Sequence, residues 1–102
     1  MSGFVTIGRA DEVEEGQMRA SEMAGQRVAV ARVGDTLHAF GDTCTHRQCS
    51  LAEGDLEGTV VTCPCHGSQF EAATGVVLHG PAEHPVPSYR VQVTGDELQV
   101  EV

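Results

Sequence analysis

Apolar and polar residues alternate along short segments of this chain, and glycine or proline interrupts the alternation at close intervals. The segment 26–33 is β-branched and half alternating, Gly34-Asp35 follows it, and the segment 36–40 resumes the pattern. A Gly-Asp pair between two such segments predicts a β-hairpin. Gly95-Asp96 is a second predicted hairpin turn. The same pattern predicts further strands at 4–7, 59–62, 69–71, 76–78, 89–93 and 98–102.

Helix is predicted only as a minor component. The segments 11–15 and 18–23 could form at most a short helical turn, because Gly16 and Gly25 limit it. Short strands at close spacing are typical of an all-β sandwich. Since no repeat, low-complexity tract or linker divides the chain, its 102 residues are predicted to form a single domain.

Acidic residues outnumber basic residues by a wide margin. The chain has 15 Asp and Glu against 6 Lys and Arg, which gives a formal charge of −9 at pH 7. Nucleic acids and anionic membranes are therefore poor partners, because both need a basic surface. A basic patch on a partner protein would instead be attracted, which speeds encounter. The alternative is that the acidic excess only keeps a small protein soluble.

The sequence also predicts where the protein is found. It contains no run of about 18 apolar residues, which a membrane-spanning helix would need. The first six residues lack the basic and apolar regions of a secretory signal. We therefore expect a soluble protein in the cytoplasm.

Two short blocks that combine cysteine with histidine carry the most specific chemistry of the chain. They are Cys44-Thr45-His46 and Cys63-Pro64-Cys65-His66. In a Rieske centre, two thiolates hold one iron of a [2Fe–2S] cluster and two imidazoles hold the other. Each block supplies one ligand of each kind, so the candidate ligands are Cys44, His46, Cys63 and His66.

Zinc is the main alternative for these residues. A Cys2His2 zinc finger uses a cysteine pair followed by a histidine pair, with two to four residues between the first two ligands. Here a single residue separates Cys44 from His46, and each block mixes the two ligand types. The spacing therefore favours iron–sulfur over zinc, while a zinc site and a chance set of cysteines and histidines stay open.

Neutral imidazoles change the redox chemistry of such a cluster. The formal charges of two ferric ions, two sulfides and two thiolates sum to zero, whereas four thiolates would leave the oxidised cluster with a charge of −2. An electron is then easier to add, and Rieske potentials span roughly −150 to +300 mV against about −400 mV for plant-type clusters. The pattern thus indicates a one-electron redox centre.

The motif residues resemble those of the Rieske ferredoxins. The matching parts are 44–49, 63–70 and Gly80-Pro81-Ala82, and with the residues between them they cover about the middle third of the chain. The resemblance implies a Rieske-like antiparallel β-sandwich base at about 1–42 and 82–102, which carries a smaller cluster-binding lobe at about 43–81.

The resemblance also implies how one [2Fe–2S] cluster is held. Cys44 and Cys63 would bind the inner iron, and His46 and His66 would bind the outer iron. The imidazole edges would then face solvent and form the exit for the electron.

Two further cysteines match a pair in high-potential Rieske proteins. There the residues matching Cys49 and Cys65 form a disulfide that ties the two ligand loops together. The alternative for this chain is two buried free thiols, because a cytosolic setting usually keeps thiols reduced.

Four other residues are predicted to tune the cluster. In the high-potential relatives, the serine matching Ser68 donates a hydrogen bond to a bridging sulfide. A tyrosine that donates to a ligand sulfur stands there in place of Phe70. Gly67 is predicted to allow close approach of backbone N–H groups, with an ordinary tight turn as the alternative. Pro81 is predicted to lie in a third loop that shields the cluster.

The function implied by the resemblance is that of a soluble, monomeric one-electron carrier. It would accept electrons from a flavin-dependent reductase and pass them to a terminal oxygenase, docking each at the face formed by His46 and His66. The sequence shows no nucleophile constellation, substrate-pocket motif or open iron position, so the chain itself is not expected to be an enzyme. The alternatives are an electron-input subunit of a larger oxidoreductase, a redox sensor and a zinc-bound interaction module.

Overall fold

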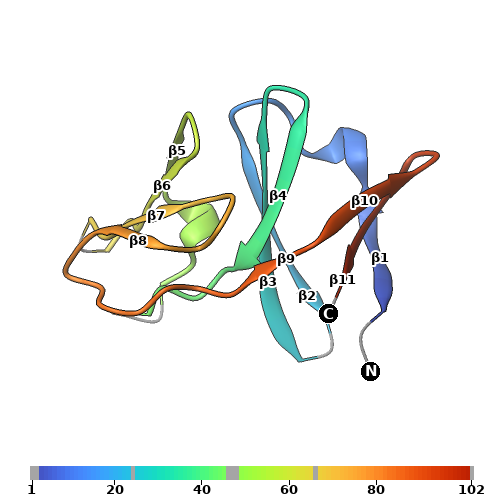
Figure 1. Ribbon diagram of the computed structural model, residues 1–102. Coiled ribbons are helices and arrows are strands. Elements are labelled where there is room, and N and C mark those ends of the chain that lie inside the picture. The colour runs from blue at the N-terminus through green and yellow to red at the C-terminus, as the bar shows by residue number, and fades with distance from the viewer. Residues whose placement is uncertain (1–2, 24, 46–48, 66, 102) are drawn as a thin grey trace.

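The computed structural model describes residues 3–23, 25–45, 49–65 and 67–101, and nearly all of its regular structure is strand (Figure 1). The strands are β1 (Phe4–Arg9), β2 (Met18–Met23), β3 (Gln26–Val33), β4 (Thr36–Gly41), β5 (Asp55–Glu57), β6 (Val60–Thr62), β7 (Gln69–Glu71), β8 (Val77–His79), β9 (Ser88–Tyr89), β10 (Val91–Thr94) and β11 (Glu97–Glu101). Short 3₁₀ turns lie at η1 (Ala10–Glu12) and η2 (Leu51–Glu53). None of the helices among the described residues is long and apolar enough to cross a membrane. The predicted all-β fold is confirmed.

The described strands form three antiparallel sheets. The first has the order β1-β11-β10, the second β2-β3-β4-β9 and the third β5-β6-β7-β8. In Figure 1 the second sheet stands between the other two, and the third sheet lies beside it on the side away from β1 and β11. Both predicted hairpins are present, β3–β4 around Gly34-Asp35 and β10–β11 around Gly95-Asp96.

The helical turn predicted for 18–23 is wrong, because this segment is the strand β2. It pairs with β3 along its whole length, from Met18↔Ala31 to Met23↔Gln26. A helix of six residues is marginal by itself, whereas β3 offers partners for the backbone groups of this segment that face it. The 3₁₀ turn of this region is η1, which lies earlier in the chain.

Two other elements differ from the sequence pattern. The predicted strand 89–93 is divided at Arg90, because β9 pairs with β4 in the second sheet and β10 pairs with β11 in the first. The strand β5 was not predicted. Its three residues place one half-buried leucine, Leu56, between two exposed acids, which is too short an alternation to recognise.

The central strand β3 is buried on both faces, and it separates two hydrophobic cores. Val28, Ala29, Val30 and Ala31 are each at most 1% exposed. The two valines pack between the first two sheets with Val13, Ala39, Leu98 and Val100. The two alanines face a second cluster, called the loop core below, with Phe40, Cys44, Leu51, Val61, Cys63, Phe70, Ala72, Ala82 and Val86. Alternate residues of a strand point to opposite faces, so the two alanines lie on the same face of β3. Because their side chains are small, the loops can approach the sheet closely.

Candidate metal centre

Cys44 and Thr45 of the first cysteine block follow β4, and the described residues Cys49 and Ser50 lie back beside them. Thr43 and Ser50 form an isolated antiparallel bridge at the neck of this loop. Next to the neck, the Cys44 N–H donates a hydrogen bond to the Cys49 carbonyl, with an N···O distance of 2.9 Å. Cys44 is 2% exposed and belongs to the loop core. The first loop therefore holds one cysteine side chain inside the core.

The second block follows β6 in a similar way. The Cys63 N–H donates to the Ser68 carbonyl at 2.8 Å, and the Gly67 N–H donates back to the Cys63 carbonyl at 3.2 Å. Cys63 is also 2% exposed and lies in the loop core. Gly67 has a φ of 78°, a left-handed conformation that supports the tight-turn alternative for this glycine.

A third loop, which contains the cis peptide bond Gly80-Pro81, is tied to both cysteine loops. The Ala82 N–H donates to Ser68 Oγ at 3.0 Å, and Thr45 Oγ1 donates to the His84 carbonyl at 2.6 Å. Ser68 is fully buried. Its oxygen accepts the bond from Ala82, so its hydroxyl proton is left to donate to another acceptor, as the predicted bond to a sulfide requires.

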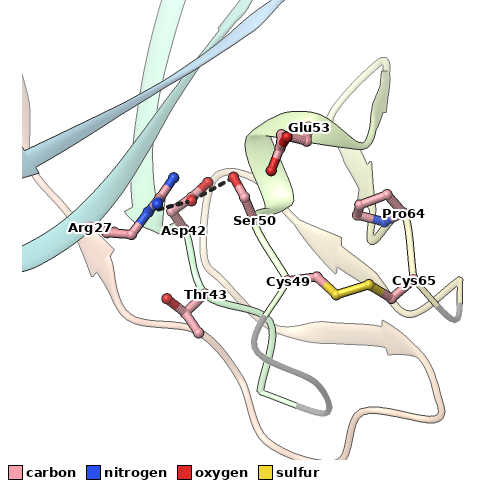
Figure 2. Close-up of a pocket in the computed structure, with 8 residues that line it drawn as sticks. All are labelled: Arg27, Asp42, Thr43, Cys49, Ser50, Glu53, Pro64 and Cys65. Atoms are coloured by element: carbon pink, nitrogen blue, oxygen red, sulfur yellow. Dashed lines mark hydrogen bonds and ion pairs between the residues drawn. A yellow bond between two sulfur atoms is a disulfide. The ribbon is translucent and has the colours of Figure 1, made fainter.

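A disulfide between Cys49 and Cys65 joins the two cysteine loops directly, as predicted (Figure 2). The two residues are 16 positions apart in the sequence, and their Cα atoms are 6.5 Å apart. In the chain-entropy model, closing a loop of this length stabilises the folded state by roughly 3 kcal/mol. Cys49 is half-buried, whereas Cys65 is exposed.

The sulfur atoms of the described residues fit an iron–sulfur site. Cys63 Sγ lies within 4.8 Å of the sulfurs of Cys49 and Cys65. Those two share a bond and offer no thiolate, so this trio is not itself a metal site. Cys44 and Cys63 lie outside the disulfide, and both are buried in the same core. Two thiols in one apolar cluster fit a cluster iron, which prefers soft ligands.

The predicted histidine ligands, His46 and His66, lie outside the described residues. The structure therefore brings together the two predicted cysteine ligands, Ser68, Phe70 and the third loop. The assignment of all four ligands stays a prediction.

A buried carboxylate that sequence reasoning missed holds the base of the first cysteine loop. Asp42 is fully buried, and its Oδ2 accepts hydrogen bonds from Arg27 Nε at 3.2 Å and Ser50 Oγ at 2.6 Å. Its Oδ1 accepts from the Ala52 N–H at 2.9 Å, and its carbonyl accepts from the Leu51 N–H at 2.7 Å. Figure 2 shows Asp42 between Arg27 on β3 and the loop. One side chain thus connects the second sheet to both ends of this loop.

No local signal marks Asp42 in the sequence. Its partner Arg27 lies 15 positions earlier, and the two residues meet only because β3 and β4 form a hairpin. In the sequence, an aspartate that follows an apolar strand is indistinguishable from an ordinary turn residue. Only its burial, which the structure reveals, indicates a special role, because a buried charge needs partners.

Most of the chain also matches a known family. A family model described as the Rieske [2Fe-2S] domain matches residues 3–90. The chain belongs to this family. A Rieske domain carries one [2Fe–2S] cluster, so the zinc and chance-ligand alternatives are rejected.

Rieske ferredoxins are among its relatives. Ferredoxin CarAc from Metapseudomonas resinovorans is 39% identical over 98 residues, which are 95% of this chain and 92% of the relative. The structure resembles the ferredoxin of carbazole 1,9a-dioxygenase from Nocardioides aromaticivorans IC177, with a TM-score of 0.91 and 30% identity over 95% of each chain. It also resembles a chain in a complex of reduced oxygenase and oxidized ferredoxin in carbazole 1,9a-dioxygenase. There the TM-score is 0.89, with 37% identity over 95% of this chain and 91% of that chain.

Phe70 is buried close to the two predicted cysteine ligands, and its tuning role stays a prediction. It is fully buried on β7, opposite Val61 of β6, and it shares the loop core with Cys44 and Cys63. A phenylalanine contributes apolar packing here but donates no hydrogen bond to sulfur.

We expect Asp42→Ala to lower the free energy of unfolding by about 2–4 kcal/mol, because the Ala52 N–H and the Ser50 hydroxyl lose a buried acceptor. The same change should weaken cluster retention, because the first loop loses its anchor. Urea unfolding and iron content per chain measure the two effects. Asp55→Ala removes an exposed carboxylate from β5 and is the matched control, with an expected change within about 0.5 kcal/mol. Equal effects of the two substitutions would contradict the anchoring role.

We expect Phe70→Tyr to raise the reduction potential by some tens of millivolts. For a one-electron couple, about 59 mV corresponds to a tenfold change in the equilibrium constant for reduction. The added hydroxyl would donate to a ligand sulfur, and that bond stabilises the more negative, reduced cluster. Redox titration of the holoprotein measures the shift. Phe40→Tyr adds the same hydroxyl elsewhere in the loop core and should leave the potential unchanged. An unchanged potential in Phe70→Tyr would mean that residue 70 does not face the sulfur.

Proposed function

We propose that this Rieske protein is a one-electron carrier that delivers electrons to a terminal oxygenase. The observation that carries the proposal is a match over nearly the whole chain, in sequence and in fold, to proteins named as ferredoxins, one of them the ferredoxin of a dioxygenase. A further match is to a chain in a solved complex of an oxygenase with a ferredoxin. The bound cluster supplies a site that gains and loses one electron. No enzymatic step of the chain's own is part of this proposal.

The four motif residues are the proposed ligands of the cluster. Cys44 and Cys63 would hold the inner iron from within the loop core, and His46 and His66 would hold the outer iron. The buried positions of both cysteines support this arrangement. The ligand loops are joined by the disulfide and by the third loop, so they can hold the same geometry in both oxidation states. The division into a base and a lobe at about 43–81 stays a prediction.

The charge distribution supports a basic docking surface on the partners. Between residues 43 and 86 the sequence contains the single basic residue Arg47 and the acidic residues Glu53, Asp55, Glu57, Glu71 and Glu83. Opposite charges on a partner would steer the encounter without requiring tight binding. A flavin-dependent reductase as electron donor, a monomeric state and a cytoplasmic location complete the proposal.

Replacing any one of Cys44, His46, Cys63 and His66, by serine for cysteine and alanine for histidine, should abolish the cluster. The reason is that one of the two irons would lose one of its two protein ligands in each variant. Iron and acid-labile sulfide should then fall well below the two of each per chain expected for the parent protein. The double variant Cys49→Ser and Cys65→Ser should still bind a cluster, and His38→Ala is the histidine control. A full cluster in any of the four ligand variants would contradict this assignment.

The carrier function is tested by electron delivery. The reduced protein, mixed anaerobically with the oxygenase of a matching dioxygenase system, should transfer one electron per chain. The loss of its reduced Rieske EPR signal measures this transfer. The second-order rate should fall as ionic strength rises, because salt screens attraction to the acidic chain. A rate no faster than that to an unrelated iron–sulfur protein would contradict the function. A rate independent of salt would contradict only the electrostatic docking.

A further inference from the structure

A pocket of about 490 Å³ opens beside the first cysteine loop, and the Cys49–Cys65 disulfide forms part of its wall (Figure 2). Its described lining also contains Arg27, Asp42, Thr43, Ser50, Glu53 and Pro64. Neither Cys44 nor Cys63 is among the described residues that line it. A small molecule in this pocket would therefore meet the disulfide without touching the proposed cysteine ligands.

The two sulfurs of the disulfide are unequally accessible. Cys65 is exposed, whereas Cys49 is half-buried at the neck of the first loop. Exposed disulfides are the ones that exchange readily with thiols, and the sulfur that is attacked depends on access. The structure therefore favours attack at Cys65, with Cys49 as the leaving group.

The pocket also selects for charge. Arg27 is paired with Asp42, so these two charges largely cancel. Glu53 lines the same pocket, and its side chain is drawn on the pocket side of η2 in Figure 2. Since the whole chain carries −9, a thiol with an ammonium group is attracted and a thiol with a carboxylate is repelled.

We propose that the Cys49–Cys65 disulfide is a reversible modification site for small aminothiols, which reach it through this pocket. A thiolate attacks Cys65 Sγ, the Cys49–Cys65 bond breaks, Cys49 leaves as a thiolate, and a mixed disulfide forms on Cys65. A second aminothiol attacks the mixed disulfide and releases the Cys65 thiolate together with the oxidised aminothiol. Two small thiols are thereby oxidised to one disulfide, and the protein disulfide is reduced to two thiols.

The exchange has a consequence for the metal centre, and this part rests on the proposed ligands. Breaking the bond removes the covalent link between the two cysteine loops. It also leaves a thiolate on Cys49, whose sulfur lies within 4.8 Å of Cys63 Sγ in the disulfide form. A competing thiolate next to an iron ligand, in a loop that is no longer tethered, should speed the loss of iron.

The test exposes the purified protein, with whatever metal it carries, to cysteamine, 2-mercaptoethanol or thioglycolate at equal thiolate concentrations. Free thiols are then blocked with iodoacetamide, and peptides are mapped by mass spectrometry. The mixed disulfide should be found on Cys65 and the blocking group on Cys49. Cysteamine should react roughly fivefold faster than thioglycolate at low salt. This ratio corresponds to about 1 kcal/mol, the interaction energy of two unit charges about 4 Å apart in water.

Two variants separate the pocket from the overall charge. Glu53→Gln should bring the cysteamine and thioglycolate rates closer together. Glu57→Gln removes an equal charge from β5, outside this pocket, and should leave their ratio near that of the parent protein. Modification of Cys49 instead of Cys65, equal rates for the three thiols, or equal effects of the two variants would overturn the proposal.

Iron release to a chelator, measured with and without cysteamine, tests the consequence separately. Faster release in the parent protein, but not in the Cys49→Ser and Cys65→Ser double variant, is the expected result. Peptide mapping needs no cluster, so it decides the exchange even if the proposed carrier function fails.

Discussion

The buried carboxylate of Asp42 is the interaction on which the rest of the metal centre depends. It lies where the second sheet ends and the first cysteine loop begins, and it accepts hydrogen bonds from Arg27, Ser50 and Ala52. A buried charge is tolerated only with such partners, so the loop is held in the one arrangement that supplies them. Arg27 is about half exposed, and water therefore shares in stabilising its charge.

The remaining contacts extend this anchor to the second and third loops. The disulfide links the two cysteine loops, Ser68 holds the third loop through Ala82, and Thr45 holds it through His84. These covalent and polar links add to the apolar packing of the loop core. The same disulfide borders a pocket, so the link that stabilises these loops is also the one open to chemistry.

Much of the fold could be predicted from the sequence, and particular residues show where prediction failed. The β3–β4 hairpin follows from a turn pair between two alternating segments, a signal contained in neighbouring residues. Segment 18–23 was misread because its strand character comes from pairing with β3 and not from its own composition. Asp42 was missed for a similar reason, since its partner Arg27 becomes a neighbour only when the hairpin forms. The disulfide was anticipated only because the chain resembles proteins that contain one.

The sequence by itself determined which residue types are available as ligands and most of the strand pattern, because both depend on residue type and spacing within a few positions. Cys44 and Cys63, each with a nearby histidine, predict a Rieske centre without reference to the fold. Only the tertiary structure decided that both cysteines lie in one core, that Asp42 is buried, and that Cys65 is more accessible than Cys49. Burial and access are properties of surfaces brought together from distant parts of the chain, and no local pattern encodes them.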